Sequence, residues 1–456
     1  MHENELKHLK KNLGKYAEGF IESLSDFPKR AVRINRLKAD PEKIASALCL
    51  TQKAAYCEDS YLITDNINGA HPYHRAGLFY MQEPSAMLAV EAARPYIEKI
   101  VKEREYPLLL DMCAAPGGKS GQLAALLGGK GALISNEIDY KRAKTLASNL
   151  ERLGVRNCAV LSSPSEKIAT VFGNIFDAVA GDAPCSGEGM LRKEEAAWDN
   201  MNEKTMLSCA ERQREILENA VLCLKEGGVL VYSTCTLNET ENEGVLEDFI
   251  KSGVLAALDC PHLTLVRKSE RQTAYRALPQ DGGGEGHFVC VLEKKTGGEK
   301  KAKPKSPFST KFDEKKLFAA LSPLAKDPIF HTPYIYGENV FLCPPLPEMR
   351  NLQIINAGVN VAALMKNTIV PSHGFVAALR KNEVSTAVNF PYVIGDNTFK
   401  ASGRSLIEKY LRGEELDICA PFSGFGVICA DSHPLGLVKA SGGVLKNHYP
   451  KGLRTR

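Results

Sequence analysis

The stretch PLLLDMCAAPGGKSGQLAALLGGKGALISNEID, residues 107–139, decides the fold of this 456-residue chain. An apolar run ends at Asp111, a glycine-containing turn leads into a segment with helical spacing, and a second apolar run ends near Glu137. A strand, a helix and a strand joined by short turns are typical of a parallel β-α-β unit. The stretch therefore predicts an open α/β sheet.

The same alternation continues toward the C-terminus. Segments of helical spacing lie at residues 140–154 and 211–227. Strand-like runs lie at residues 157–163, 175–182 and 227–234. A last apolar run at 287–295, after a glycine-rich loop, is typical of an antiparallel edge strand. We expect one Rossmann-like α/β domain over residues 106–294.

Three further segments flank this domain. Residues 1–105 mix helical and strand-like runs and predict an N-terminal α+β extension. Residues 295–312 begin with lysines, glycines and a proline, which is the composition of a basic linker. Residues 313–456 predict a second globular unit with short strand-like runs and a glycine-rich basic end.

Charge is distributed unevenly along the chain. The formal net charge is only +4, but residues 300–456 contain 21 Lys and Arg against 12 Asp and Glu, which leaves 37 against 42 for residues 1–299. Lys and Arg side chains bind phosphates with release of counterions. A basic C-terminal unit on a mildly acidic body therefore favours a polyanionic partner.

The composition excludes several classes of protein. Hydrophobic residues make up 44% and charged residues 25%, as in soluble globular proteins, and no run of 18 apolar residues is present. The N-terminus is polar where a secretory signal would be apolar, so we expect a cytoplasmic protein. The thirteen cysteines include no Cys-x-x-Cys and no zinc spacing, which predicts mostly reduced thiols and no bound metal.

Two acidic positions suggest a nucleoside-like cofactor at the sheet edge. The turn from Asp111 to Lys119 contains Gly117 and Gly118 but matches neither Gly-x-Gly-x-x-Gly nor a P-loop, which disfavours a phosphate cofactor. Glu137 follows the next strand, where an acidic side chain accepts hydrogen bonds from ribose hydroxyls in such folds. Ligands of open α/β sheets bind at the carboxyl ends of the strands.

Two cysteines follow neighbouring predicted strands at the same edge. Asp182-Ala-Pro-Cys185 ends one strand and Ser233-Thr-Cys235 ends the next. Two thiols without further Cys or His ligands are too few for zinc. Their position instead suits thiol chemistry on a substrate ring.

Together these motifs resemble the S-adenosylmethionine-dependent RNA cytosine-5 methyltransferases of the Nop/Sun family. The similarity extends to the segments around Arg33, Gln82, Arg152 and Gly286, and the C-terminal segment 446–454 is similar to the tail of bacterial small-subunit rRNA enzymes of the RsmF type. The resemblance implies a class I methyltransferase domain with a mostly parallel seven-stranded sheet and a C-terminal PUA-like RNA-binding domain. An amino-group methyltransferase is disfavoured, because its Asn/Asp-Pro-Pro-aromatic turn is replaced by Asp-Ala-Pro-Cys.

The resemblance also implies site residues. Cys235 would add to carbon 6 of cytosine, Cys185 would assist its release, and Asp182 and Lys119 would contact the base. S-adenosylmethionine would be bound by one set of residues along the strand ends: Cys113, Ala114, Ala115, Pro116, Gly117, Gly118, Lys119, Glu137, Arg142, Ser163 and Asp182. Ser163 occupies the place where many relatives have an aspartate near the adenine.

RNA would be bound by basic residues from both ends of the chain, namely Arg33, Lys446, His448, Lys451 and Arg454. The implied substrate is 16S rRNA or the 30S ribosomal subunit, methylated near the decoding region. A tRNA cytosine-5 methyltransferase and a non-enzymatic RNA-binding or ribosome-assembly factor remain as alternatives. The sequence does not decide the oligomeric state, and we expect a monomer.

Overall fold

The computed structural model describes most of the chain: residues 3–64, 67–193, 196–298, 307–308, 310–366, 368–393, 397–418 and 422–455. Most of the predicted basic linker, residues 299–306 and 309, lies outside these ranges. Within the described residues, no helix is long and apolar enough to cross a membrane.

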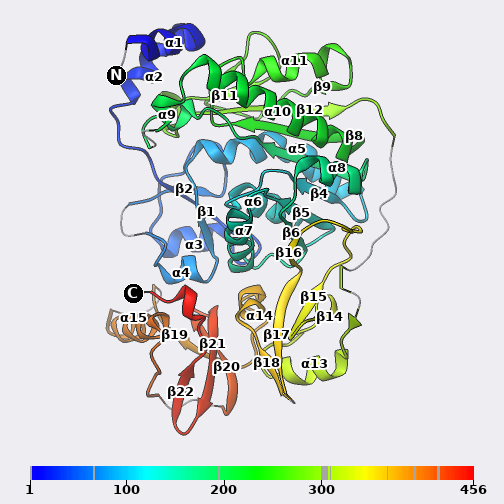
Figure 1. Cartoon of the computed structure of the whole chain (residues 1–456). Coiled ribbons are helices and arrows are strands. Elements are labelled where there is room, and N and C mark those ends of the chain that lie inside the picture. The colour runs from blue at the N-terminus through cyan, green and yellow to red at the C-terminus, as the bar shows by residue number, and fades with distance from the viewer. Residues whose placement is uncertain are drawn as a thin grey trace.

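A ten-stranded sheet forms the centre of the molecule (Figure 1). Five strands are mutually parallel in the order β8-β7-β4-β5-β6: β4 Leu108–Asp111, β5 Ala132–Asn136, β6 Cys158–Leu161, β7 Phe176–Asp182 and β8 Leu224–Thr234. The predicted edge run forms β12 (His287–Lys294), which pairs antiparallel with β8. The predicted mainly parallel α/β sheet is thus confirmed.

The sheet has ten strands instead of the expected seven, because short strands extend both edges. β9 (Leu255–Ala257), β10 (Arg267–Lys268) and β11 (Tyr275–Ala277) lie on the β12 side, and β16 (Ile354–Ala357) pairs antiparallel with β6 at the other edge. β8 also begins at Leu224, within the segment that the sequence predicts as helical.

Helices cover both faces of this sheet. α5 (Leu88–Glu103), α6 (Gly118–Leu127) and α7 (Tyr140–Arg152) pack on one face, whereas α8 (Ser165–Phe172), α10 (Glu203–Cys223) and α11 (Glu243–Lys251) pack on the other. Successive strand residues point to opposite faces. Leu109 accordingly joins the core under α5, and Leu108 and Leu110 join the core under α10.

The N-terminal part forms a small antiparallel sheet with helices. Its strands run in the order β2-β1-β3: β1 Ala31–Ile34, β2 Ser60–Leu62 and β3 Phe79–Met81. Its helices are α1 Glu3–Leu13, α2 Ala17–Ser23, α3 Pro41–Ala47 and α4 Pro72–Arg75. The short helices α9 (Ala196–Asp199) and α12 (Pro279–Gly282) belong to the central domain, and α12 packs against α2.

The C-terminal half contains two further sheets, seen in the lower part of Figure 1. The first comprises β13 Thr310–Lys311, β14 Thr332–Tyr336, β15 Asn339–Cys343, β17 Val359–Met365 and β18 Thr368–Pro371. The second comprises β19 Ala387–Phe390, β20 Gly424–Ala430, β21 His433–Ser441 and β22 Val444–Asn447. Their helices are α13 Glu314–Leu321, α14 His373–Ala378 and α15 Asn397–Arg412.

Residues 313–456 contain a buried core of their own, but one of their segments also packs into the central domain. The segment before and within β16 contributes to the core of the central ten-stranded sheet. Leu346, Met349 and Leu352 pack with residues of β4, β6 and α8 in one buried cluster. The backbone continues this contact, because Ser162 donates its N–H to the Gln353 carbonyl at 2.8 Å. The C-terminal half therefore completes one edge of the central domain.

Positively charged side chains join the N-terminal part, the central domain and the C-terminal half, because they donate hydrogen bonds to backbone carbonyls at the C-termini of helices. Arg152 of α7 donates to the His74 carbonyl in α4, Arg380 donates to the Gly154 carbonyl after α7, and Arg156 donates to the Ala378 carbonyl at the end of α14. Cations are favourable at the negative end of the helix dipole. Each of these bonds joins an element to a loop or helix distant in sequence, so the parts are held in one arrangement.

Leu346→Ala should destabilise the central domain although it lies in the C-terminal half. Leu346 is fully buried, and truncating such a leucine costs about 2–5 kcal/mol. Denaturant unfolding followed by far-ultraviolet circular dichroism measures this loss. The exposed Phe318→Ala is the matched control, and an unchanged free energy of unfolding for Leu346→Ala would contradict the shared core.

Candidate active site

The predicted site residues meet at the carboxyl ends of the parallel strands. A cavity of about 620 Å³ lies there, between the ends of β4 to β8 and helix α10. Of the predicted cofactor residues, the cavity is lined by Cys113, Ala115, Glu137, Arg142, Ser163 and Asp182, together with both predicted catalytic thiols, Cys185 and Cys235. Ala114, Pro116, Gly117, Gly118 and Lys119 do not line it directly.

The glycines of the first turn bring the backbone close to neighbouring elements. Gly117 has a φ of +110° and directly precedes α6, a conformation that favours glycine. A Cβ at Gly118 would lie 3.1 Å from both the Gln82 and Tyr80 side chains of the N-terminal part. The turn is thus packed between α7 and the N-terminal sheet, and its residues Cys113 and Ala115 face the cavity.

Arg33 supports this turn and is not a surface residue. Its guanidinium is buried, and it donates to the Gly118 carbonyl at 2.8 Å and to the Gln122 side chain at 3.2 Å. A third hydrogen bond goes to the Gln82 side chain, so the buried guanidinium joins the N-terminal part to the turn before α6. That Arg33 binds RNA stays a prediction. Its motif was recognised, but burial could not be read from the sequence.

Glu137 and Arg142 form one side of the cavity. The Glu137 carboxylate is buried, accepts from the Asp139 N–H at 3.1 Å and lies 3.4 Å from the Arg142 guanidinium. Arg142 also donates to the Ala115 carbonyl at 3.2 Å. A carboxylate fixed in this way can accept hydrogen bonds from two vicinal hydroxyls.

Asp111, the last residue of β4, has a buried carboxylate. One carboxylate oxygen accepts from Ser120 at 2.6 Å, and the other has no hydrogen-bond partner among the described residues although it is buried. Burial raises the pKa of Asp111 to about 7. Asp111 itself does not line the cavity, so the fit to S-adenosylmethionine rests on Glu137, a carboxylate of the cavity wall that can accept hydrogen bonds from the ribose hydroxyls.

Ser163 is held between two parts of the chain. Its hydroxyl accepts from the Gln353 N–H at 3.1 Å, and its backbone N–H and carbonyl bond to the Asn136 side chain at 3.1 and 3.0 Å. Because Gln353 directly precedes β16, the C-terminal half forms part of this wall of the cavity. The predicted contact of Ser163 with adenine stays a prediction.

The two predicted catalytic cysteines lie side by side. The Cys185 and Cys235 sulfur atoms are 2.9 Å apart, and both cysteines are free thiols. Two effects raise the pKa of the Cys185 thiol well above its ordinary value: the contact with Cys235, which is the larger, and burial. Parallel pairing of Asp182 with Ser233 places the two loops at the same level of the sheet.

Buried carboxylates hold the two cysteine loops together. Glu241 accepts from the Ser186 N–H at 3.0 Å, from Asn238 at 2.9 Å and from Gln213 at 2.9 Å. It therefore bridges the residue after Cys185 and the loop after Cys235. Burial raises the pKa of Glu241, although these hydrogen bonds oppose the effect.

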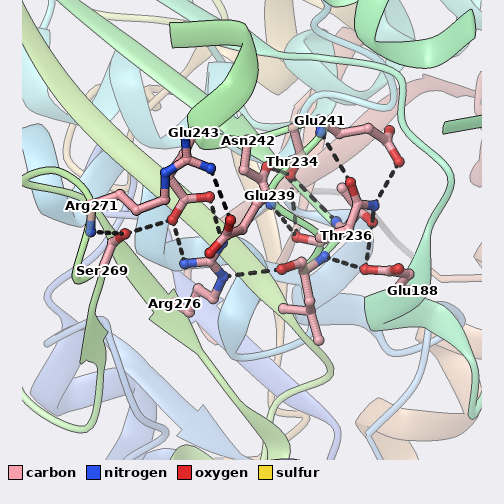
Figure 2. A network of polar contacts seen from close by, with 12 residues as sticks. Glu188, Thr234, Thr236, Glu239, Glu241, Asn242, Glu243, Ser269, Arg271 and Arg276 are labelled. Atoms are coloured by element: carbon pink, nitrogen blue, oxygen red, sulfur yellow. Dashed lines mark hydrogen bonds and ion pairs between the residues drawn. The ribbon is translucent and has the colours of Figure 1, made fainter. Parts of the chain in front are cut away.

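Glu188 fixes the Cys235 loop from the other side (Figure 2). It accepts from the Leu237 N–H at 2.8 Å and from the Thr236 hydroxyl at 3.0 Å, and it lies 2.6 Å from His8 of α1. The backbones also meet directly, because Gly189 donates to the Cys235 carbonyl at 2.8 Å.

A second group of polar contacts fastens the segment after Cys235, also shown in Figure 2. Asn242 accepts from the Thr234 hydroxyl at 2.7 Å and donates to the Thr236 carbonyl at 3.1 Å. Arg276 forms two hydrogen bonds of 2.6 Å with Glu243. The position of Cys235 is thus set by groups on both of its sides.

Asp182 lies at the centre of a cluster of charged and polar side chains next to the thiols of Cys185 and Cys235. It accepts from Lys119 at 2.7 Å and from the Ser233 hydroxyl at 2.7 Å, and His287 lies 3.5 Å away. Burial raises the pKa of Asp182, but Lys119 and His287 lower it by more, so it lies below its ordinary value. Asp182 is therefore ionised at neutral pH.

The other predicted RNA-binding residues differ in their surroundings. Lys446, His448 and Lys451 are exposed at the C-terminal end of the molecule. Arg454 is half-buried and donates to the Tyr449 carbonyl at 3.3 Å, so it also stabilises the local fold. Among the residues that the structure describes, no group of three or more His, Cys, Asp or Glu side chains is placed to hold a metal ion.

Sequence reasoning missed several residues that line the cavity, namely Asn136, Ile138, Pro184, Arg212, Glu215 and Ile216. Ile138 has a signal, since it directly follows Glu137 at a strand end. Arg212, Glu215 and Ile216 lie on one face of α10, but nothing in their spacing distinguishes that face from a solvated one. His287 was noted only as part of a motif, and its approach to Asp182 depends on the pairing of β12 with β8.

Comparison with protein families confirms the resemblance that the motifs indicated. A family model described as 16S rRNA methyltransferase RsmB/F matches residues 99–293. A model of the N-terminal domain of 16S rRNA methyltransferase RsmF matches residues 3–84, and a model of the methyltransferase RsmF PUA domain matches residues 401–455.

Individual relatives extend the match over nearly the whole chain. The chain is 30% identical to the ribosomal RNA small subunit methyltransferase F of Shewanella sp. (strain MR-4), over 96% of this chain and 93% of that protein. It is 32% identical to the protein of the same name from Vibrio campbellii, over 81% of each. A solved methyltransferase homolog from Pyrococcus horikoshii has 25% identity and a TM-score of 0.54, over 64% of this chain and all of that one.

Lys119→Met should raise the pKa of Asp182. Without the ammonium group, burial opposes ionisation of the carboxyl with less compensation, so its pKa should move toward or above its ordinary value. Carbon-13 NMR of the Asp182 carboxyl across a pH titration measures the change. The exposed Lys144→Met serves as the control, and an unaltered Asp182 titration in Lys119→Met would show that the ion pair does not set this pKa.

Proposed function

This chain belongs to the family of 16S rRNA methyltransferases RsmB/F, and we propose that it methylates carbon 5 of a cytosine in 16S rRNA, with S-adenosylmethionine as methyl donor. The observation that carries this proposal is the pair of free thiols, 2.9 Å apart, beside the Asp182–Lys119 ion pair and in the same cavity as Glu137. Methylation of an amino group or a hydroxyl has no use for a thiol nucleophile, whereas carbon 5 of cytosine needs one.

The cavity wall assigns residues to the cofactor. Glu137 would accept hydrogen bonds from the ribose hydroxyls, and Cys113 and Ala115 would border the ligand. S-adenosylmethionine, when bound, supplies an electrophilic methyl group. Arg142 would keep the Glu137 carboxylate and the first turn in place, because it contacts both.

Cys235 would activate the base. Carbon 5 of cytosine is a weak nucleophile, and addition of a thiolate to carbon 6 makes carbon 5 electron-rich. In this step the Cys235 sulfur forms a bond to carbon 6, and the electron pair of the 5,6 double bond becomes available at carbon 5. The buried contacts of Glu188 and Glu241 would keep the sulfur in position for the attack.

Asp182 and Lys119 would recognise the pairing edge of the base. The resemblance implies that both residues contact the base, but an ionised carboxylate only accepts hydrogen bonds and ring nitrogen 3 of cytosine is also an acceptor. We therefore assign Asp182 to the exocyclic amino group and the Lys119 ammonium to nitrogen 3. Lys119 suits this role, because burial lowers its pKa but Asp182 raises it by more, so the amine stays protonated.

Cys185 would act after methyl transfer. The proton on carbon 5 must then leave, and the bond between carbon 6 and Cys235 must break. Cys185 lies next to the leaving sulfur, and its raised pKa keeps it as a thiol that can donate a proton to that sulfur. The Cys185 thiolate that remains would take the proton from carbon 5, directly or through water, and the electron pair of that bond would re-form the 5,6 double bond as the bond from carbon 6 to sulfur breaks. Without Cys185, release would be slow.

The substrate would be an unpaired or flipped-out cytosine, since carbons 5 and 6 are not open to attack within a stacked duplex. Exposed Lys446, His448 and Lys451, all within the region that matches the PUA model, would contact phosphates of 16S rRNA or of the 30S subunit in the cytoplasm. The share of the chain matched by small-subunit relatives favours rRNA over tRNA.

Cys235→Ala should abolish methylation, whereas Cys185→Ala should trap a covalent enzyme–RNA adduct. The first variant lacks the attacking sulfur and the second lacks the group that assists its departure. Purified protein is incubated with a 16S rRNA transcript and S-adenosylmethionine, and a denaturing gel under reducing conditions separates free protein from the adduct.

The partly exposed Cys209→Ser controls for loss of a thiol outside the pair. An adduct with Cys235→Ala but not with Cys185→Ala would reverse the two roles. Wild-type methylation at a position other than carbon 5, found by mass spectrometry of the nucleosides, would refute the proposed reaction.

A further inference from the structure

His287 is a buried histidine with an unused nitrogen beside the catalytic carboxylate. It is the first residue of β12, and its side chain is only 3% exposed. Its Nε2 atom is buried and has no hydrogen-bond partner among the described residues, yet it lies 3.5 Å from Oδ1 of Asp182. A normal hydrogen bond of this type measures about 2.7–3.2 Å, so the contact is close but not formed.

Asp182 already accepts hydrogen bonds from two other donors. Lys119 occupies Oδ2, and the Ser233 hydroxyl occupies Oδ1. If Lys119 turns toward a bound cytosine, Asp182 loses its strongest contact at Oδ2 and needs another donor. A buried ring nitrogen without a partner costs free energy, and a small shift of the carboxylate would relieve this cost at His287.

We propose that His287 is a positioning residue that donates Nε2–H to Asp182 in the RNA complex and so keeps the carboxylate aimed at the cytosine edge. This inference rests on the proposed function. His287 does not touch the substrate in this account, since its ring is covered by the sheet. Its effect is exerted through Asp182, while Lys119 engages the base.

Single-turnover methylation of a 16S rRNA transcript tests this role. His287→Phe keeps the ring shape but has no donor, and we expect the rate to fall by about tenfold to a hundredfold, as for other misplaced catalytic groups. His287→Gln can place an amide nitrogen near the Nε2 position and should recover most of the rate. The exposed His262→Phe is the control, and the affinity for S-adenosylmethionine should be unchanged in all three variants.

The outcomes distinguish a failure of the positioning role of His287 from a failure of the proposed function. Wild-type rates for His287→Phe, or equal losses in His287→Phe and His287→Gln, would overturn the positioning role. Absence of 5-methylcytosine with the wild-type protein would instead overturn the proposed function. In a Cys185→Ala background, His287→Phe should also slow formation of the covalent adduct, and an unchanged adduct rate would contradict the proposal.

The distance between the two thiols carries a second, independent inference. The sulfurs of Cys185 and Cys235 are 2.9 Å apart, and a disulfide bond needs about 2.05 Å, so they need to approach by only about 0.9 Å. Both line the cavity and are partly exposed. Disulfides in cytosolic proteins are usually transient and often sense oxidants.

We propose that a hydroperoxide converts this pair to a reversible disulfide that switches the enzyme off. The Cys235 thiolate would attack one peroxide oxygen, the O–O bond would break, and a sulfenic acid and hydroxide would form. Cys185 would then attack the sulfenic sulfur and expel its oxygen as water. The two sulfurs lose two electrons in total, the peroxide gains them, and the nucleophile is blocked until a thiol reduces the bond.

Hydrogen peroxide treatment of the full chain tests the switch. We expect complete loss of methylation, a Cys185–Cys235 cross-linked peptide in mass spectrometry, and full recovery with dithiothreitol. Cys209→Ser should form the same cross-link. Oxidation of Cys235 without the cross-link, or a loss that dithiothreitol does not reverse, would overturn the proposal, and the peptide readout does not depend on which base is methylated.

Discussion

The parallel pairing of β7 with β8 is the constraint on which the rest of the site depends. It aligns Asp182 with Ser233, so the chain leaves both strands at one level and the two following loops run side by side. Cys185 and Cys235 come together for this reason, although 49 residues separate them. The Ser233 hydroxyl, from the partner strand, also bonds the Asp182 carboxylate directly. Buried carboxylates then hold the loops, and such networks define one geometry when all their members are paired.

The same edge of the sheet joins the site to distant parts of the chain. The N-terminal part reaches it through Arg33, under the cofactor turn, and through His8, which contacts Glu188. The C-terminal half reaches it through Gln353, which bonds Ser163 in the wall of the cavity. The part of the chain that carries Lys446, His448 and Lys451 thus also contributes Gln353 to the surroundings of the cavity, and is not attached to the central domain by a linker alone.

Much of the fold was predictable, because apolar periodicity marks buried parallel strands and ligands bind where such strands end. That rule alone brought Asp111, Glu137 and the two cysteine loops to one edge. β16 could not be predicted, since four residues of ordinary composition become a strand only by pairing with β6. The burial of Arg33 could not be predicted, because a positive charge in a motif indicates a contact but not whether the partner is RNA or a backbone carbonyl. The networks around Glu188, Glu241 and His287 depend on tertiary contacts that no local pattern encodes.

The central claim is that this chain uses its two adjacent thiols to activate and release a cytosine in 16S rRNA, so that carbon 5 can take the methyl group of S-adenosylmethionine. Bisulfite sequencing of 16S rRNA and tRNA tests it most directly, in cells with the gene, without it, and complemented with the wild type or Cys235→Ala. The account predicts a protected cytosine in 16S rRNA that disappears without the gene and returns only with the wild type. A protected cytosine lost from tRNA alone, or 16S rRNA that is unchanged without the gene, would contradict it.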